Sequence, residues 1–181
     1  MSADLRATFE SALLLVPHLQ VQNANAISSP MTWGFPSITA FVGLMAALER
    51  KLGAAAGLQF NGVGVVCHHF EAQTHQGYTH SFHLSRNPVR KDGSTAGIVE
   101  EGRIHLDISL VFDVSLSSQV ADDAARQQLA QTVADLLATM RIAGGSVIAP
   151  HSPRSRRALQ PQLRLEAEEP EQQRQEFAQL S

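Results

Sequence analysis

Cysteine is almost absent from this chain of 181 residues, which contains only Cys67. One cysteine cannot form an internal disulfide, and the sequence has no Cys-x-x-Cys pair or zinc-finger spacing. These absences argue against redox chemistry and against a structural zinc site. We therefore expect no metal and no cofactor.

Long hydrophobic runs are missing as well. No apolar run approaches the roughly twenty residues that a membrane span requires. The first residues, MSADLRATFESALLLVP, lack the basic start and the small-residue cleavage site of a secretory signal. We expect a cytoplasmic protein whose 44% hydrophobic content builds one core, with room for an extended appendage.

Neither sign of charge is in excess over most of the chain. Up to Gln160 there are 12 Lys and Arg against 12 Asp and Glu; residues 161–181 contain 2 against 5 and account for the net charge of −3. Such a neutral body does not favour nonspecific binding of nucleic acid. Any RNA contact would have to depend on local basic groups. These are Arg86, Arg90, Lys91 and Arg103 around one loop, and Arg141 beside a glycine pair.

Phosphate-binding signatures are also lacking, because GVGVV has no third glycine and no Walker lysine is present. The pair Gly144-Gly145 follows an expected helix that ends near Arg141. It either lets a phosphodiester approach the backbone beside an arginine or forms an ordinary helix C-terminal cap. The loop Asp92–Thr95, next to Arg90 and Lys91, is either a similar contact or a solvated turn.

What the sequence does contain is a long polar stretch, QVQNANAISSPMTWGFPS, at residues 20–37. It places about fifteen residues between an expected strand and an expected helix, where compact domains use roughly two to six. Trp33 and Phe35 make disorder a poor interpretation. Uncharged hydrogen-bonding groups beside a flat ring suit a nucleotide base or a partner surface better than catalysis. The polar candidates are Asn23, Asn25, Ser28, Ser29 and Thr32.

A plainer interpretation of the same stretch stays open. Trp33 and Phe35 could plug the core while the Asn and Ser residues form local turns.

Periodicity predicts an α+β fold. Strands are expected at 13–21, where Pro17 indicates an edge or a bulge, at 104–114 and at 146–149. A hairpin is expected from 62–75 and 78–87 around Gln76-Gly77. Helices are expected at 38–52, capped by Ser37, and at about 120–140, with Asp122 and Asp123 at the start. The predicted apolar stripes are Ile38, Phe41, Val42, Met45, Leu48 and Leu52 in the first helix, and Ala125, Leu129, Val133, Leu136, Leu137 and Met140 in the second.

This order of elements resembles a ferredoxin-like βαββαβ sheet with an inserted hairpin. Residues 87–102 form a turn-rich excursion. We assign residues 1–150 to this domain and residues 151–181 to a polar, acidic tail or weak helix.

Histidines are concentrated in the predicted hairpin. Metal ligation would need three or four to converge, and the expected register places none directly opposite another. A general-base histidine is an alternative, but no Tyr or Lys accompanies one in a recognisable spacing, which favours solvated histidines. The residues are His68, His69, His75, His80 and His83.

Several long sequence motifs resemble those of a known protein family. The runs QNANAISSPMTWGFPS and NPVRKDGSTA, with NGVGVVCHHFEAQ and MRIAGGSV in order around them, resemble the N-terminal half of the Csy-type subunit of type I-F CRISPR surveillance complexes. That subunit belongs to the Cas-five branch of the RAMP superfamily. The resemblance extends from about residue 13 to residue 148.

The resemblance implies a noncatalytic RNA-binding protein with a ferredoxin-like (RRM/RAMP) palm and an inserted thumb hairpin. It implies that the chain binds the 5′ handle of CRISPR RNA, pairs with the large Csy subunit and abuts a backbone Csy subunit. Single-stranded RNA is read by stacking and by hydrogen bonds to base edges. The handle-facing candidates are Asn23, Asn25, Ser28, Ser29, Trp33, Phe35, Arg86, Arg90, Lys91, Arg141, Gly144 and Gly145.

Members of that family are much longer chains, and their C-terminal half is missing or reduced here. Three interpretations follow: a fragment, a compact functional subunit, or a truncated decoy that inhibits complex assembly or function. A further alternative is a RAMP endoribonuclease with His68 or His83 as its base.

Overall fold

A computed structural model describes residues 9–86, 88–120, 122–149 and 160–165. They form an α+β structure built on one antiparallel sheet with the strand order β10-β11-β1-β9-β4, in which β12 also pairs with β1. The strands are β1 (Phe9–Asn25), β4 (Leu58–Ala72), β9 (Arg103–Ser117), β10 (Arg141–Ile142), β11 (Gly145–Ile148) and β12 (Gln162–Leu165).

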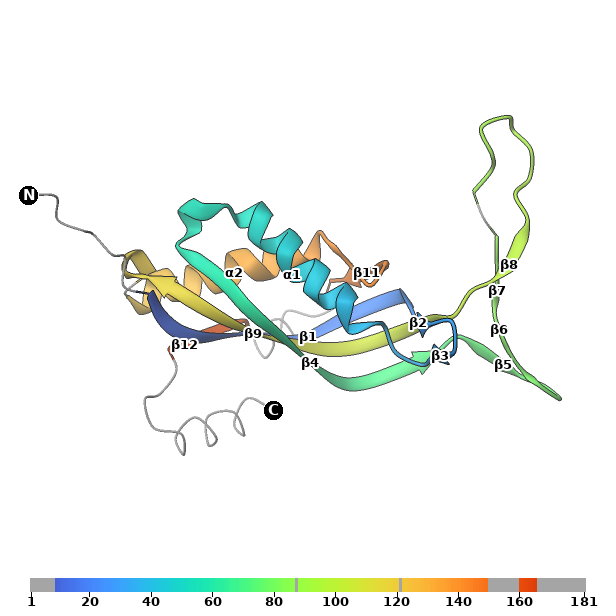
Figure 1. Cartoon of the computed structure of the whole chain (residues 1–181), viewed down its shortest axis with the longest axis horizontal. Coiled ribbons are helices and arrows are strands. Elements are labelled where there is room, and N and C mark those ends of the chain that lie inside the picture. The colour runs from blue at the N-terminus through green and yellow to red at the C-terminus, as the bar shows by residue number, and fades with distance from the viewer. Residues whose placement is uncertain (1–8, 87, 121, 150–159, 166–181) are drawn as a thin grey trace, which may run out of the picture.

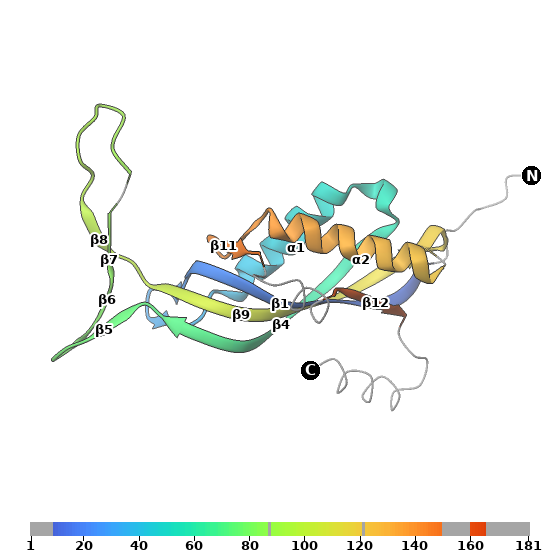
Figure 2. The same ribbon diagram turned by 180° about the vertical axis from the view of Figure 1, so that it is seen from behind.

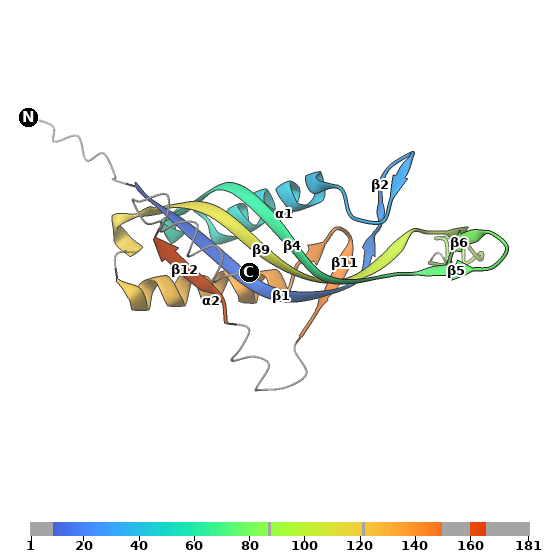
Figure 3. The ribbon, with the colours of Figure 1, turned by 90° about the horizontal axis from the view of Figure 1, so that it is seen from below.

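Two helices, α1 (Ile38–Leu52) and α2 (Asp123–Ala138), lie side by side on one face of the sheet (Figures 1 and 2). Short 3-10 turns, η1 (Ala54–Ala56) and η2 (Ser118–Val120), lead into β4 and α2. The core lies between the helices and the sheet. The opposite face of the sheet carries no described helix (Figure 3).

The central strand of the sheet is β1, which the sequence predicted too short and followed by a loop. It continues to Asn25, and its register with β9 shifts between Val16 and Leu19 and again between Val21 and Ala24. Pro17 lies in the first shift, as the bulge interpretation expected. Much of the expected loop is therefore strand, and the rest contains the small hairpin β2 (Ile27–Ser29) and β3 (Thr32–Trp33).

The predicted hairpin between residues 62–75 and 78–87 is wrong. β4 instead pairs with β9 along its whole length, from Leu58 opposite Leu116 to Ala72 opposite Ile104. The strict alternation predicted for β9 is correct, because Ile104, Leu106 and Phe112 are buried at 0 to 4% exposure. The apolar face of β9 thus determines that β4 pairs with β9 and not with the nearer segment at residues 78–87.

The insertion between β4 and β9 contains two small hairpins. One pairs β5 (Thr74–Gln76) with β6 (His80–Phe82), so Gln76-Gly77 does mark a turn. The other pairs β7 (Leu84–Arg86) with β8 (Ile98–Glu100). We call residues 84–100 the arm, which projects from the end of the sheet (Figure 1). The turn-rich excursion predicted at residues 87–102 lies mostly within this arm, whereas the two hairpins of the insertion were not predicted.

The helices match their predicted ranges closely, but α1 is rotated relative to its predicted face. Ile38 and Val42 are 58% and 47% exposed, whereas Phe41, Leu44 and Leu48 are buried. In α2 the predicted acidic start is correct, since the Asp122 side chain accepts a hydrogen bond from the Ala125 backbone N–H. Neither described helix is long and apolar enough to cross a membrane.

The expected cap at Gly144-Gly145 is wrong. α2 ends at Ala138 with Thr139 as its cap, and a tight turn at Ala143-Gly144 then joins β10 to β11. Within the expected tail, residues 162–165 form β12, a strand that the sequence did not predict. Residues 150–159 and 166–181 lie outside the described residues, so the domain boundary remains a prediction.

Candidate nucleic-acid interface

An open groove with a volume of about 620 Å³ lies beside the N-terminal half of α1. Three segments that are distant in sequence line it: the end of β1 with the β2–β3 hairpin, helix α1, and the turn after α2. The lining residues that matter below are Asn25, Ser28, Ser37, Thr39, Ala40, Gly43, Ala47, Arg141, Ala143 and Gly144. Four residues predicted from the sequence, Asn25, Ser28, Arg141 and Gly144, therefore meet in one place.

The start of α1 gives this groove a positive character. Ser37 makes no side-chain cap hydrogen bond, and the first turn contains no acidic residue. The Ser37 and Thr39 hydroxyls instead lie 2.8 Å from each other. Backbone N–H groups at an uncapped helix start carry partial positive charge and favour anions such as phosphate.

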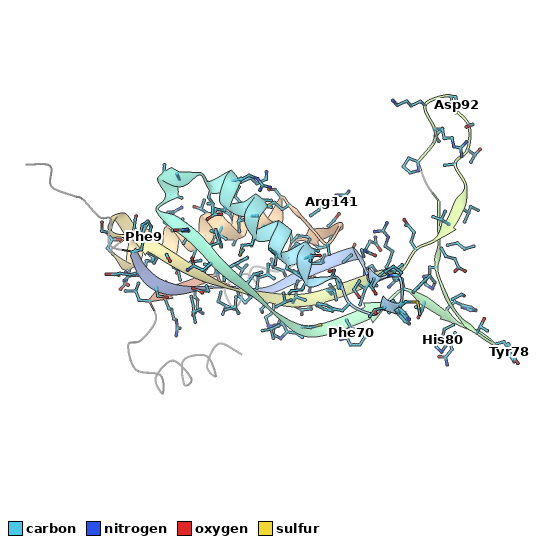
Figure 4. The ribbon with its side chains drawn as sticks, in the orientation of Figure 1. Phe9, Phe70, Tyr78, His80, Asp92 and Arg141 are labelled. Atoms are coloured by element: carbon cyan, nitrogen blue, oxygen red, sulfur yellow. The ribbon has the colours of Figure 1, made fainter. Side chains whose placement is uncertain are left out.

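Among the residues that the structure describes, Arg141 is the only charged one that lines the groove. Its Nη1 donates to the Gly144 carbonyl at 3.2 Å, and none of the ion pairs among the described residues includes it. Figure 4 shows Arg141 on the body of the molecule, near β11 and far from the arm tip at Asp92. The guanidinium therefore retains donors for a ligand oxygen.

The turn beside Arg141 is held against the end of β1. Asn25 N–H donates to the Ala143 carbonyl at 2.9 Å, and Ala143 and Gly144 have φ values of 48° and 79°. No atom would lie within 4 Å of a Cβ at Gly144, so its backbone is open to the groove. Gly145, in contrast, is buried against β1 and cannot contact a ligand in the groove.

The polar residues of the opening stretch mainly make local hydrogen bonds, as the plainer interpretation expected. The Asn25 amide pairs with both backbone groups of Ile27 at 3.0 Å. Ser28 Oγ donates to the Thr32 carbonyl at 3.2 Å, and Ser29 Oγ accepts from the Met31 N–H at 3.3 Å. Asn23 lies in the second bulge of β1 with φ 58° and does not line the groove.

The two aromatic candidates have different environments. Phe35 stacks on the buried ring of Phe41, with ring centroids 6.0 Å apart, and packs against the core. Trp33 is 49% exposed and meets the Phe82 ring edge to face at 5.3 Å. The core interpretation is therefore correct for Phe35, whereas Trp33 packs at the base of the arm.

The basic candidates Arg86, Arg90 and Lys91 lie on the arm and not in the groove. Arg86 belongs to β7, opposite Ile98, while Arg90 and Lys91 are exposed near the tip. Hydrogen bonds from the Ser94 hydroxyl and backbone N–H hold the pKa of Asp92 below its usual value, so this carboxylate stays charged and closes the tip turn. The arm thus presents both signs of charge.

The histidines do not form a metal site: no group of three or more potential ligands converges among the described residues. His68 lies in a bulge of β4, where its Nε2 hydrogen-bonds to the buried Ser109 hydroxyl at 2.7 Å. Its ring stacks on His18 at 4.1 Å, and His18 Nδ1 lies 3.0 Å from Asp107. This cluster stabilises the two bulges and leaves His68 Nε2 engaged within the protein.

Sequence reasoning missed the α1 side of the groove. Thr39, Ala40, Gly43 and Ala47 are small residues on a helix surface, and no local pattern distinguishes them from ordinary surface positions. Only the rotation of α1 and the return of the chain after α2 reveal that they face Arg141. Of the twelve residues predicted from the sequence, four line the groove, and only Asn25 and Arg141 among them are amide or basic.

Comparison with known proteins gives the family. The family described as CRISPR-associated protein (Cas_Csy2) matches residues 14–181. The CRISPR-associated protein Csy2 of Pseudomonas aeruginosa (strain UCBPP-PA14) is 50% identical over 147 residues, which are 80% of this chain and 44% of that relative. The chain therefore spans less than half the length of the curated relative. With this agreement over most of its residues, the chain belongs to the CRISPR-associated Csy2 family.

Proposed function

We propose that this chain is a noncatalytic RNA-binding component of a type I-F CRISPR complex and that its groove holds part of the 5′ handle of CRISPR RNA. One observation carries the proposal: a helix start without a side-chain cap, an arginine outside the described ion pairs and an open glycine turn meet in one groove. The described residues that line this groove include no acidic side chain. Family membership supports the choice of ligand.

The groove suits a single strand better than a duplex. Its one arginine and the helix start match one or two phosphates, while the Ser28, Ser37 and Thr39 side chains offer donors and acceptors to base edges. The arm provides Arg90 and Lys91 for a longer RNA. A duplex-binding surface would require a much larger set of cations.

The fold supports the same assignment. The strand order β11-β1-β9-β4, with α1 between β1 and β4 and α2 between β9 and β11, supports our proposal of a ferredoxin-like RAMP palm, in which the arm would serve as the thumb. In this proposal the large Csy subunit and a backbone Csy subunit are the protein partners. In this proposal RNA cleavage is not part of the function; the hydrogen bond from His68 Nε2 to a buried serine argues against His68 as its general base.

The test is binding of a fluorescent single-stranded RNA with the handle sequence. Gly43→Glu places a carboxylate in the groove at a position where a Cβ meets no atom within 4 Å. We expect it to weaken binding at least tenfold, and Arg141→Ala to weaken it roughly tenfold, equivalent to about 1.4 kcal/mol. Wild-type protein should leave the RNA intact.

Gln128→Glu is the matched control, since it adds the same charge on the exposed surface of α2. It should bind RNA as wild type does. If Gly43→Glu folds normally and binds the handle as tightly as Gln128→Glu, the groove is not the RNA site.

A further inference from the structure

The outer edge of β4 forms one side of the main sheet. Among the described residues, no strand pairs with this edge, although β4 is 15 residues long. Val63 and Val65 remain half-buried, while Phe112 and Leu110, their partners in β9, are fully buried. An edge of this kind presents unpaired N–H and C=O groups, which another strand satisfies best.

Edge strands normally carry features that prevent such pairing, and the opposite edge of this sheet has them. β10 and β12 contain two and four residues, and each includes an arginine, Arg141 or Arg164. From Leu58 to Phe70, β4 contains no Lys, Arg, Asp, Glu or Pro. On β4 the protection against association is limited to the Glu49 carboxylate at Phe60 and to two bulges, which leaves residues 62–67 unprotected.

A stripe on α1 continues this surface. The Glu49 carboxylate accepts a hydrogen bond from the Phe60 N–H at 3.2 Å, which places the Glu49 side of the helix over the edge of β4. Ile38, Val42 and Glu49 are spaced four and seven residues apart, so they lie on one side of α1. Ile38 and Val42 are exposed there, and Phe70 of β4 is 60% exposed.

We propose that this surface, the β4 edge with Ile38 and Val42 of α1, docks a second copy of the chain. The two β4 strands pair antiparallel about a twofold axis and extend one sheet through both copies. A second copy fits because an uncharged strand opposite itself brings no like charges together. Because the opposite edge of the main sheet is short and charged, pairing at β4 closes the assembly at two copies. The groove lies on the other side of α1, so this proposal does not depend on RNA binding.

The bulges of β4 limit the register. Its register with β9 shifts between Phe60 and Gly62 and between Cys67 and His69, which leaves residues 62–67 regular. A twofold axis perpendicular to the sheet keeps the helices of both copies on the same face. One residue of β4 then lies directly opposite the same residue of the second copy. With Val65 at the axis, Val63 lies opposite Cys67 of the second copy and Gly64 lies opposite Val66.

The test is the mass of the full chain in solution, measured by light scattering or sedimentation across a wide range of concentrations. We expect twice the 19.6 kDa of one chain. Gly64→Lys should give a monomer, because a Cβ there meets only Val111 at 3.7 Å or more, so the lysine is tolerated but charges the edge. Gly97→Lys makes the same change on the exposed arm and should remain dimeric.

A cross-link tests the register independently of how Gly64→Lys folds. Val63→Cys should give a covalent dimer with Cys67 of the second copy on mild oxidation by dioxygen, since directly opposed Cα atoms lie about 4.5–5.5 Å apart, within the range that a disulfide spans. Val66→Cys, which points to the other face, should not. A monomeric wild type, an assembly larger than two chains, a folded Gly64→Lys dimer, or a Val63→Cys dimer without the cross-link would each overturn the proposal.

Discussion

Gly145 shows how a single residue positions the groove. A Cβ at this position would lie 2.7 Å from the Gln22 carbonyl oxygen and 2.8 Å from the Ala24 nitrogen. Because both neighbours are backbone atoms, the strands would have to separate. We expect Gly145→Ala to lower the free energy of unfolding by about 1–3 kcal/mol in urea titration.

Gly144→Ala is the control for that change. Its Cβ enters open space, but its φ of 79° costs an L-residue about 1–2 kcal/mol. Crowding of the backbone is the wrong explanation if Gly145→Ala is no more destabilising than Gly144→Ala.

Trp33 and Phe82 form the second contact that is open to measurement at the residue scale. Edge-to-face rings at 5.3 Å predict a coupling of about 0.5–1.5 kcal/mol between them. A double-mutant cycle of Trp33→Ala and Phe82→Ala, followed by urea unfolding, measures this coupling. Additive effects would show that the contact does not stabilise the base of the arm.

Individual residues were only partly predictable from the sequence. In the plainer interpretation, the amide and hydroxyl groups at Asn25, Ser28 and Ser29 were correctly expected to form local turns. Asn25 and Ser28 also line the groove. The neighbours of Trp33 were unpredictable, because Phe82 comes from a hairpin about fifty residues later in the chain.

Among the elements, the helices and β9 were predictable because their signals are local. The alternation in β9 and the periodicity of α1 and α2 depend on neighbours within a few residues. The pairing of β4 was not predictable in the same way. Its turn signal at Gln76-Gly77 is real, but it governs only β5 and β6, while the long-range apolar match to β9 determines the sheet.

The arm lies outside the core, which leads to an element-scale prediction. Replacing residues 88–97 by a short turn should change the free energy of unfolding by no more than about 0.5 kcal/mol, because surface changes away from packed groups have small effects. Removal of Arg90 and Lys91 should weaken binding of a long handle RNA. Chemical denaturation and RNA titration of the same variant measure both.

A short RNA that fits the groove alone is the control for the arm. It should bind the shortened variant as tightly as it binds wild type. Equal loss for short and long RNA would contradict the separation between groove and arm.

At the scale of the whole molecule, neutrality limits the electrostatic part of binding. The groove contains one arginine and a helix start, so it should neutralise one or two phosphates. The slope of log K against log salt is about −0.7 per phosphate for single strands. We expect a shallow slope, between about −0.7 and −1.4, for short RNA. A slope steeper than about −3 would indicate a larger cationic surface elsewhere.

The groove itself could not have been predicted from any one segment. It joins residues near positions 25–28, 36–47 and 140–144, which only the complete fold brings together. The family resemblance could be recognised from the sequence because it depends on contiguous motifs. The groove, in contrast, is formed by segments that are distant in the sequence. The chain shares the family but covers 44% of its curated relative, so its own binding surface has to be mapped directly.

The most direct measurement is therefore mapping of RNA–protein cross-links by mass spectrometry, with handle RNA that carries photoreactive uridines. Our account predicts cross-links in the three segments that line the groove, at residues 25–28, 36–47 and 140–144. Cross-links confined to the open face of the sheet around His18 and His68, with none in these segments, would contradict it.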